Sequence, residues 1–145
     1  MTRGGYGSKV HLMTEANGLP IGLVLTQGNR NECPVFEELL EQTLQHGGGM
    51  MPQRLAADRG YSADRLRNKL QAMGIEPVIP MRKTEHVKDR PAFNAGAYKG
   101  RNVIERCVGK LKDMRRIGTR YEKLASSYRA MLTLGMIVLY LRALI

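Results

Sequence analysis

An Asn-Gly pair between two short apolar runs is the feature that most restricts the fold of this chain. Asn17-Gly18 stands inside "EANGLP", and Asn-Gly is a strong signal for a tight turn between antiparallel strands. The flanking runs predict strands at about residues 8–15 and 20–27. We therefore expect a β-hairpin, whose edge needs a neighbouring element to bury it.

Helix and strand signals alternate after the hairpin. "CPVFEELLEQTLQH", with an early proline and glycines behind it, predicts an amphipathic helix. "RLAAD" predicts a short buried strand ending on Asp58, and "EPVIP" predicts another strand. Between them, "SADRLRNKLQAMG" predicts a helix capped by Ser62 or Asp64 and ended by Gly74. This order predicts an α/β fold with a mixed sheet, antiparallel at first and with parallel crossovers later.

The C-terminal third predicts two long helices, at about residues 97–117 and 122–143, broken near Gly118. A charged loop, "MRKTEHVKDRPAFNAGA", precedes them. The most apolar run spans residues 130–141, which is shorter than the roughly 20 residues of a membrane span. It predicts a buried helix. Because the N-terminus also lacks the apolar segment of a signal peptide, we expect a cytoplasmic protein without membrane contact.

Length and charge narrow the class of partner. The 145 residues fit one domain, and the net charge is +10. A domain this basic faces a polyanion, either nucleic acid or an anionic membrane surface, or is merely a well-solvated basic protein. Residues 99–123 hold nine basic and three acidic residues, a net charge of +6. This segment predicts contacts with a nucleic-acid backbone.

Cysteine and histidine spacings give no metal site. Cys33 and Cys107 lie far apart and have no partner at zinc-ligand spacing, and nothing in the sequence demands a disulfide between them. His11, His46 and His86 show neither ligand nor catalytic-triad spacing. A single disulfide between the two cysteines is possible, and we expect the three histidines to be structural.

One carboxylate interrupts the basic segment. If residues 98–116 form one helix, then Tyr98, Arg101, Glu105 and Lys112 share a face about 60° wide. The neighbouring face is apolar and should point to the core; its residues are Ile104, Cys107, Val108, Leu111 and Met114. Glu105 could simply pair with Arg101 four residues earlier. Alternatively, it could bind a metal ion while the cations bind phosphate.

The second interpretation needs another acid, and Asp58 supplies it. An acid at the carboxyl end of a strand in an open α/β sheet projects into the ligand crevice. Hard cations such as Mg²⁺ are held by one or two carboxylates together with substrate phosphates. Asp58 could instead be a turn or cap residue, since Asp is common in turns.

At this point the residues resemble those of a known family. The spacing Tyr98-x2-Arg101-x3-Glu105-x6-Lys112 is similar to the Y-x2-R-x3-E-x6-K signature of bacterial insertion-sequence DDE transposases. "LAADRGY" resembles the segment of their second catalytic Asp, and "PVIP" resembles the strand after it. The hairpin and the C-terminal helices resemble theirs too. The likeness covers nearly the whole chain.

The resemblance implies an RNase H-like fold and an active site of two Asp and one Glu that cuts and joins DNA with Mg²⁺ or Mn²⁺. Asp58 would be the second carboxylate and Glu105 the third. The residues expected to contact DNA at the transposon ends or the target are Tyr98, Arg101, Lys112, Arg115 and Arg116.

The first catalytic Asp has no counterpart in this sequence. In the family it lies on the first strand of the fold, which would precede Met1. Glu15 is the nearest acid, and we interpret it as a hairpin-turn residue. Residues 1–145 are therefore expected to be an N-terminally truncated catalytic domain, with a partial sheet that lacks its first strand and long C-terminal helices.

These expectations leave two functions open. The chain could be the catalytic part of a transposase, inactive unless the missing strand is supplied by an overlapping reading frame. It could also be a decayed remnant that binds DNA, or pairs with a transposase, and so regulates transposition. A homo-oligomer or pairing with the N-terminal part is expected, in a nucleoid-associated bacterial protein. The signature spacing argues against a nuclease of repair or RNA processing.

Overall fold

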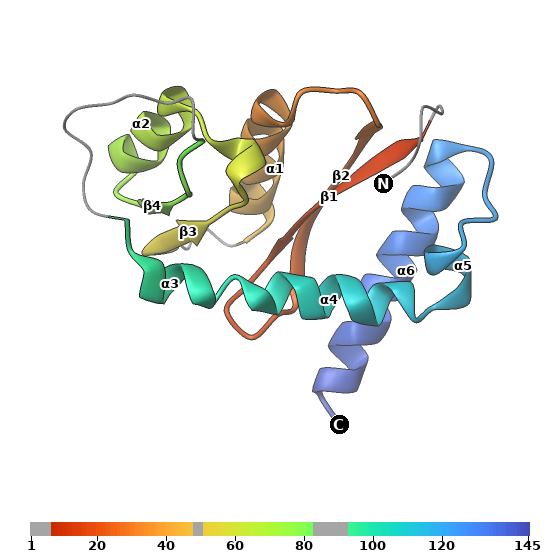
Figure 1. The fold of residues 1–145 in the computed structure, drawn as a ribbon. Coiled ribbons are helices and arrows are strands. Elements are labelled where there is room, and N and C mark those ends of the chain that lie inside the picture. The colour runs from red at the N-terminus through yellow and green to blue at the C-terminus, as the bar shows by residue number, and fades with distance from the viewer. Residues whose placement is uncertain (1–6, 48–50, 83–92) are drawn as a thin grey trace. The chain divides into compact units, whose positions relative to one another are not determined.

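The computed structural model describes residues 7–47, 51–82 and 93–145, and Figure 1 shows the path of the chain. These residues form two compact units, Met1–Arg30 with Asn102–Ile145 (the hairpin unit) and Asn31–Arg101 (the crossover unit). The elements are β1 Ser8–Thr14, β2 Pro20–Gln27, α1 Glu32–His46, β3 Arg54–Ala56, the 3-10 helix η1 Arg59–Tyr61, α2 Asp64–Ala72, β4 Glu76–Val78, α3 Ala95–Lys99, α4 Asn102–Lys112, α5 Arg115–Gly118 and α6 Ala125–Ala143.

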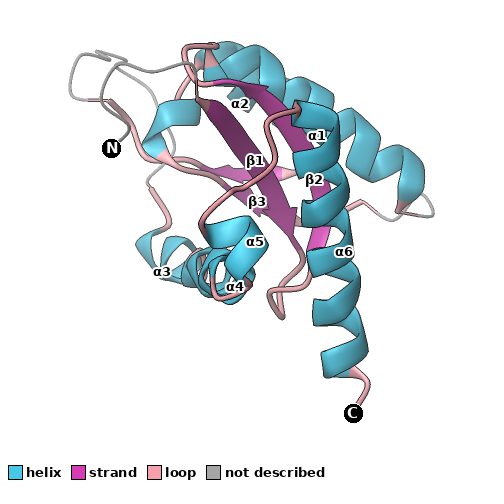
Figure 2. Cartoon of the chain, turned by 90° about the vertical axis from the view of Figure 1, so that its right-hand side faces the viewer, coloured by secondary structure: helices cyan, strands magenta, loops and turns pink. Residues whose placement is uncertain are grey.

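The predicted β-hairpin is confirmed. β1 and β2 pair antiparallel with Ser8 opposite Gln27, and the register shifts between Met13 and Thr14. Helix α6 contacts β2 along one face of this ribbon (Figure 2). His11 is buried on β1 and lies 3.0 Å from the hydroxyl of Thr26 through Nε2. This contact fits the structural role expected of His11.

The hairpin turn follows from its residues. Gly18 has a φ of 90°, a conformation that costs glycine nothing and other residues much more. One carboxylate oxygen of Glu15 accepts the backbone N–H of Asn17 and the other accepts that of Leu19, each at 2.9 Å. Glu15 is therefore a hairpin-turn residue, as predicted.

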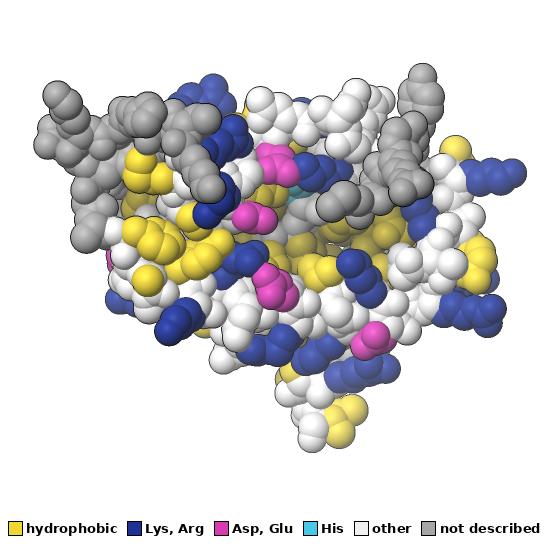
Figure 3. Space-filling model, viewed as in Figure 1, with side chains coloured by type: hydrophobic (Ala, Val, Ile, Leu, Met, Phe, Trp, Pro, Cys, Tyr) yellow, Lys and Arg dark blue, Asp and Glu magenta, His cyan; other side chains and the backbone are white. Residues whose placement is uncertain are grey.

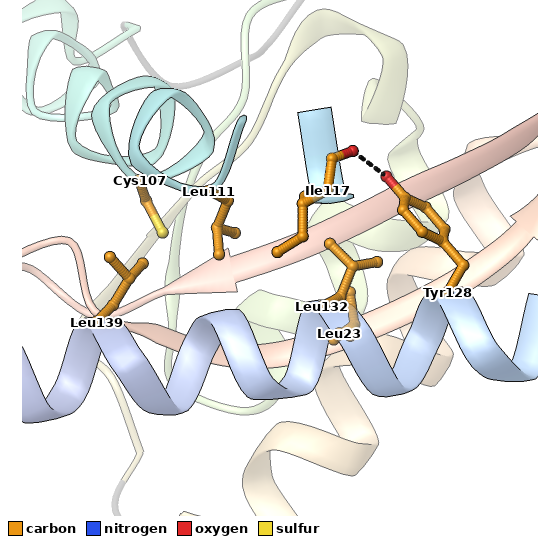
Figure 4. Close-up of a cluster of buried hydrophobic side chains, with 7 residues drawn as sticks. All are labelled: Leu23, Cys107, Leu111, Ile117, Tyr128, Leu132 and Leu139. Atoms are coloured by element: carbon orange, nitrogen blue, oxygen red, sulfur yellow. Dashed lines mark hydrogen bonds between the residues drawn. The ribbon is translucent and has the colours of Figure 1, made fainter. Parts of the chain in front are cut away.

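The core of the hairpin unit lies between β2, α4, α5 and α6 (Figure 4). Its buried side chains are Leu23, Cys107, Leu111, Ile117, Tyr128, Leu132 and Leu139. The hydroxyl of Tyr128 donates to the carbonyl of Ile117 at 3.2 Å, so the polar end of this buried ring is satisfied. A Cβ on Gly135 would lie 2.5 Å from Cδ1 of Ile117, so a larger residue there would force this side chain to shift.

The crossover unit is a strand–helix–strand arrangement. β3 and β4 are parallel, with Leu55 opposite Pro77, and α2 connects them. The core residues on these elements and on α1, together with Ile75 directly before β4, are Val35, Phe36, Leu39, Leu40, Leu55, Leu66, Leu70, Ile75 and Val78. Gly74 has a φ of 73° directly after α2, which confirms it as the stop signal of that helix.

The predicted single mixed sheet is confirmed only in its strand directions. Antiparallel pairing does come first and parallel pairing later, but the described strands form two separate two-stranded sheets. Within the described ranges, β1 is paired only with β2, and β3 only with β4.

Two details of the predicted crossover unit are wrong. Neither Ser62 nor Asp64 caps α2: the N-cap position is Ala63, without a side-chain hydrogen bond. The hydroxyl of Ser62 instead accepts from Nη2 of the buried Arg67 at 2.7 Å. The strand before Asp58 ends at Ala56, two residues earlier than predicted, because the chain turns into η1.

The predicted helix over residues 97–117 is also wrong, since it is three helices. Met114 has a ψ of 108°, which ends α4 and lets α5 fold back onto the core. Arg101 N–H donates to the carbonyl of Tyr98 at 3.0 Å, a tight three-residue turn that separates α3 from α4. Of the two long C-terminal helices predicted, only α6 exists as one long helix.

The expectation of a fully buried helix near residues 130–141 fails on one face of α6. Leu132 and Leu139 are buried, whereas Leu134 and Leu141 are each 55% exposed. No helix in the described part of the chain is long and apolar enough to cross a membrane. The loop predicted at residues 3–7, most of the charged loop and His86 lie outside the described residues.

Candidate functional site

Asp58 lies between the end of β3 at Ala56 and the start of η1 at Arg59. Beyond the strand, Ala57 N–H still donates to the carbonyl of Val78 at 3.3 Å, which fixes the backbone just before the acid. Oδ1 of Asp58 then accepts the N–H of Arg59 at 2.6 Å, and the residue is exposed. Asp58 is thus the N-cap of η1, so the turn-residue interpretation is confirmed, and an exposed carboxylate remains at this position.

The loop after Asp58 is braced by a cation that the sequence interpretation missed. Arg82 donates from Nη2 to the carbonyl of Gly60 at 2.6 Å and from Nε to that of Arg59 at 3.3 Å. A Cβ on Gly60 would overlap the carboxylate of Glu32, so a larger residue there would displace this side chain. The only sequence signal for the brace is a basic residue after "PVIP".

Tyr61 closes the same loop against α1. Its ring lies 5.5 Å from that of Phe36, centroid to centroid. Burial, together with the negative charges of Glu32 and Asp58, raises the pKa of Tyr61 to about 12. Packing of the Tyr61 ring on Phe36 holds this loop against α1.

Tyr98 and Arg101 are positioned by a local packing motif at the start of α3. Asn94 caps the helix by accepting the N–H of Ala97 at 2.9 Å. Phe93, directly before the cap, packs on Tyr98 with ring centroids 5.3 Å apart, which is a hydrophobic staple. The guanidinium of Arg101 lies 5.3 Å from the centre of the Tyr98 ring, a favourable cation–π distance. The sequence interpretation missed Phe93, although an apolar residue before an Asn cap is the known signal.

Glu105 and Lys112 lie on one face of α4 and are both exposed. They are seven residues apart, two helical turns, so their Cβ atoms share a face. Cys107 and Leu111 are 2% and 3% exposed, which fixes this helix with its predicted apolar stripe toward the core. Tyr98 and Arg101 precede α4, in α3 and the turn after it, so the single helix assumed for a row of all four residues is not formed.

Arg115 and Arg116 lie on α5, both exposed. Nη1 of Arg116 is 3.8 Å from Oε1 of Glu122, a long contact at an exposed guanidinium that adds little stability. Lys and Arg side chains gather over α4 and α5 on the face seen in Figure 3. This surface can bind a phosphate backbone.

The two proposed metal ligands lie in different units, Asp58 in the crossover unit and Glu105 in the hairpin unit. Within residues 7–47, 51–82 and 93–145, no group of three or more His, Cys, Asp or Glu side chains could hold a metal ion. Both cysteines are free. As oxygen donors, the two carboxylates match the preference of Mg²⁺ and Mn²⁺.

Comparison with known proteins gives a consistent family. The family model described as "Transposase DDE domain" matches residues 2–141. A protein assigned as the transposase for insertion sequence element IS402 from Burkholderia cepacia is 37% identical over 134 residues, 89% of this chain and 60% of that relative. One assigned as the transposase for IS6501 from Brucella ovis is 31% identical over 139 residues, 93% of this chain and 98% of that relative. The chain thus spans about 60% of the length of the first relative.

Proposed function

Because this chain belongs to the family of transposase DDE domains, we propose that it acts in DNA transposition. It is the C-terminal part of an RNase H-like catalytic domain that cuts and joins transposon-end DNA by metal-dependent phosphoryl transfer. The observation that carries this proposal is the family match over residues 2–141, which includes both Asp58 and the Tyr98-to-Lys112 signature.

Asp58 and Glu105 would hold the Mg²⁺ or Mn²⁺ ions. Both carboxylates are exposed. Asp58 is held in place as the N-cap of η1, and Glu105 lies on α4, whose apolar face packs in the core. The bound ions would stabilise negative charge on the attacking and leaving oxygens of the phosphodiester. Asp58 keeps its second oxygen available for such a role, since the hydrogen bond to Arg59 uses Oδ1.

The DNA-contacting residues would be Tyr98, Arg101, Lys112, Arg115 and Arg116. Lys and Arg neutralise backbone phosphates and set the position of the duplex, without reading its sequence. The staple of Phe93 on Tyr98 and the contact of Arg101 with the same ring hold two of these side chains before DNA arrives. Less conformational entropy is then lost on binding.

The catalytic centre needs a third carboxylate, which we propose comes from a strand outside residues 7–145. One observation supports this: within the described ranges β1 pairs only with β2 and β3 only with β4, so each has an edge on which a further strand could pair. The chain without that strand would bind DNA but neither cut nor join it.

Iron-directed backbone cleavage tests the metal site. Fe²⁺ replaces Mg²⁺ in oxygen-ligand sites and, with ascorbate, cuts the polypeptide beside its ligands. With transposon-end DNA present to contribute phosphates, we expect cuts near residues 58 and 105. Asp58→Asn and Glu105→Gln should each abolish both cuts, because one ion shared by two carboxylates is lost with either.

Asp113→Asn is the matched control, since Asp113 is an exposed acid directly after α4. It removes the same charge near Glu105 and should leave the cuts unchanged. Cuts that persist in Asp58→Asn, or that fall only at other sites, would refute the shared metal site.

A non-catalytic role remains the second candidate. The net charge of +10 supports DNA binding with or without metal, and the chain covers only 60% of the IS402 relative. In this case the chain would regulate transposition by occupying DNA or pairing with a transposase. Asp58→Ala separates the two functions: it should abolish strand transfer by a completed enzyme, but leave DNA affinity equal or slightly higher.

A further inference from the structure

The loop between α5 and α6 contains a residue whose backbone conformation usually belongs to glycine. Arg120 has a φ of 47°, and it is the only residue other than glycine with a positive φ in the described part of the chain. It directly follows Thr119, the C-cap of α5, at the position where glycine most often ends a helix. Strain of this kind persists where the surrounding structure or the function requires the side chain.

The guanidinium of Arg120 is held in place on one side. It lies over the ring of Tyr128, 4.8 Å from the ring centre, which is a favourable cation–π distance. Tyr128 is itself fixed, because its ring is buried and its hydroxyl donates to the carbonyl of Ile117 (Figure 4). Nε of Arg120 donates to the backbone carbonyl of Glu122 at 3.4 Å. The side chain is therefore anchored through its ring contact and through Nε.

The outer nitrogens of the same guanidinium are left unpaired. Among residues 7–47, 51–82 and 93–145, neither Nη1 nor Nη2 of Arg120 has a hydrogen-bond or ion-pair partner. The carboxylate of Glu122 does not neutralise this charge: its Oε1 lies 3.8 Å from Nη1 of Arg116, and its side chain is only 11% exposed. Two unpaired guanidinium donors in a fixed plane match two oxygens of one phosphate or carboxylate.

The charges around the loop favour phosphate. Arg115 and Arg116 on α5 and Lys123 after Glu122 are all exposed, and they belong to the same unit as Arg120. Four cations in nine residues, with one largely buried acid among them, suit a polyanion better than a single carboxylate of a protein.

We propose that Arg120 is a further DNA-contacting residue, whose Nη1 and Nη2 bind two oxygens of one backbone phosphate. This inference rests on the proposed function in DNA transposition. The contact positions the duplex and does not read its sequence. Because the ring of Tyr128 and the carbonyl of Glu122 hold the guanidinium beforehand, little side-chain freedom is lost on binding.

Arg120→Gly separates a DNA contact from a structural role. Glycine suits a φ of 47° and removes the guanidinium, so the variant should stay folded with a urea midpoint near that of the wild type. Its affinity for duplex DNA should fall about tenfold, as expected for the loss of a charged hydrogen-bond pair. The slope of log K against log salt should decrease by about 0.9, because one phosphate contact is lost. Fluorescence anisotropy of the full chain with labelled duplex measures both.

Two further variants sharpen the result. Arg142→Ala is the matched control: it removes the same charge from an exposed site in the last turn of α6, at the far end from the loop, and should leave the slope unchanged. Arg120→Lys keeps the charge but lacks the planar pair of donors, so it should retain the slope and still bind more weakly than the wild type. If Arg120→Gly loses its helical circular dichroism, Arg120→Asn replaces it, since asparagine also adopts this backbone conformation.

The outcomes distinguish this contact from the proposed function as a whole. If Lys112→Ala lowers the salt slope but Arg120→Gly keeps the wild-type affinity and slope, the assignment of Arg120 is overturned and DNA binding by α4 and α5 stands. Wild-type affinity in Arg120→Lys would overturn the two-oxygen contact. A wild-type chain whose DNA affinity does not change with salt would overturn both proposals.

Discussion

At the residue scale, the pKa of Tyr61 reports on the loop that carries Asp58. Burial is the largest cause of its rise from 10.0 to about 12, followed by the charges of Glu32 and Asp58. The folded chain therefore holds this proton more tightly than the unfolded chain does. The contribution of the protonated Tyr61 hydroxyl to stability is fully present below pH 10 and is lost as the pH rises from 10 to about 12.

We predict that Tyr61→Phe flattens this alkaline loss, because phenylalanine has no proton to release. Urea unfolding near pH 9 and near pH 11 should give a smaller decrease in the free energy of unfolding for the variant than for the wild type. Tyr121→Phe, at a ring that is 57% exposed, is the control and should keep the wild-type decrease. An equally steep loss in Tyr61→Phe would contradict the assignment.

At the element scale, two glycines near the end of the basic segment should respond oppositely to alanine. Gly109 lies in α4, and a Cβ added to it would meet nothing within 4 Å, so Gly109→Ala should raise the free energy of unfolding by about 0.5–1 kcal/mol. A Cβ on Gly118 would overlap the carbonyl oxygen of Lys112, so Gly118→Ala should lower it by about 1–3 kcal/mol. Urea denaturation measures both, and a shared sign would show that the path from α4 to α5 is misassigned.

The elements that the sequence predicts well are those with a local chemical signal. Asn17-Gly18 locates the hairpin, and Gly74 locates the end of α2. The break at Met114 has no such signal, since methionine is a good helix former. It arises because Ile117 must turn back to reach the core beside Leu132, a requirement of tertiary packing. Tertiary packing also explains why Ser62 does not cap α2. Its hydroxyl accepts a hydrogen bond from the buried Arg67 instead.

At the scale of the whole molecule, the sequence predicts which residues could form the candidate site. It does not predict how far apart they lie in space. Residue spacing identifies Glu105 and Lys112 as one face of α4, and the strand pattern identifies Asp58 as an exposed acid near a strand end. The distance from Asp58 to Glu105 cannot be predicted from the sequence, because it depends on how two compact units meet. The contact of Arg82 with the Asp58 loop is also hard to predict from the sequence. Arg82 binds backbone carbonyl groups, which every residue carries.

The net charge of +10 predicts how the whole chain binds DNA. The affinity should fall steeply with salt, because each neutralised phosphate releases a counterion. Lys112→Ala and Arg115→Ala should each weaken binding on any sequence and reduce the slope of log K against log salt by about 0.9. Fluorescence anisotropy with labelled duplex DNA, between about 50 and 200 mM salt, measures both effects.

Arg54→Ala tests whether the effect of Lys112→Ala on DNA binding comes from a specific phosphate contact or merely from the loss of one positive charge. Arg54 is exposed, but its Nε lies 2.8 Å from the carboxylate of Glu76 in the crossover unit. Its removal changes the net charge by the same amount and frees a carboxylate outside the proposed contact set, so the salt slope should stay as in the wild type. If Arg54→Ala lowers the slope as much as Lys112→Ala, DNA is held by diffuse charge and not by the surface of α4 and α5.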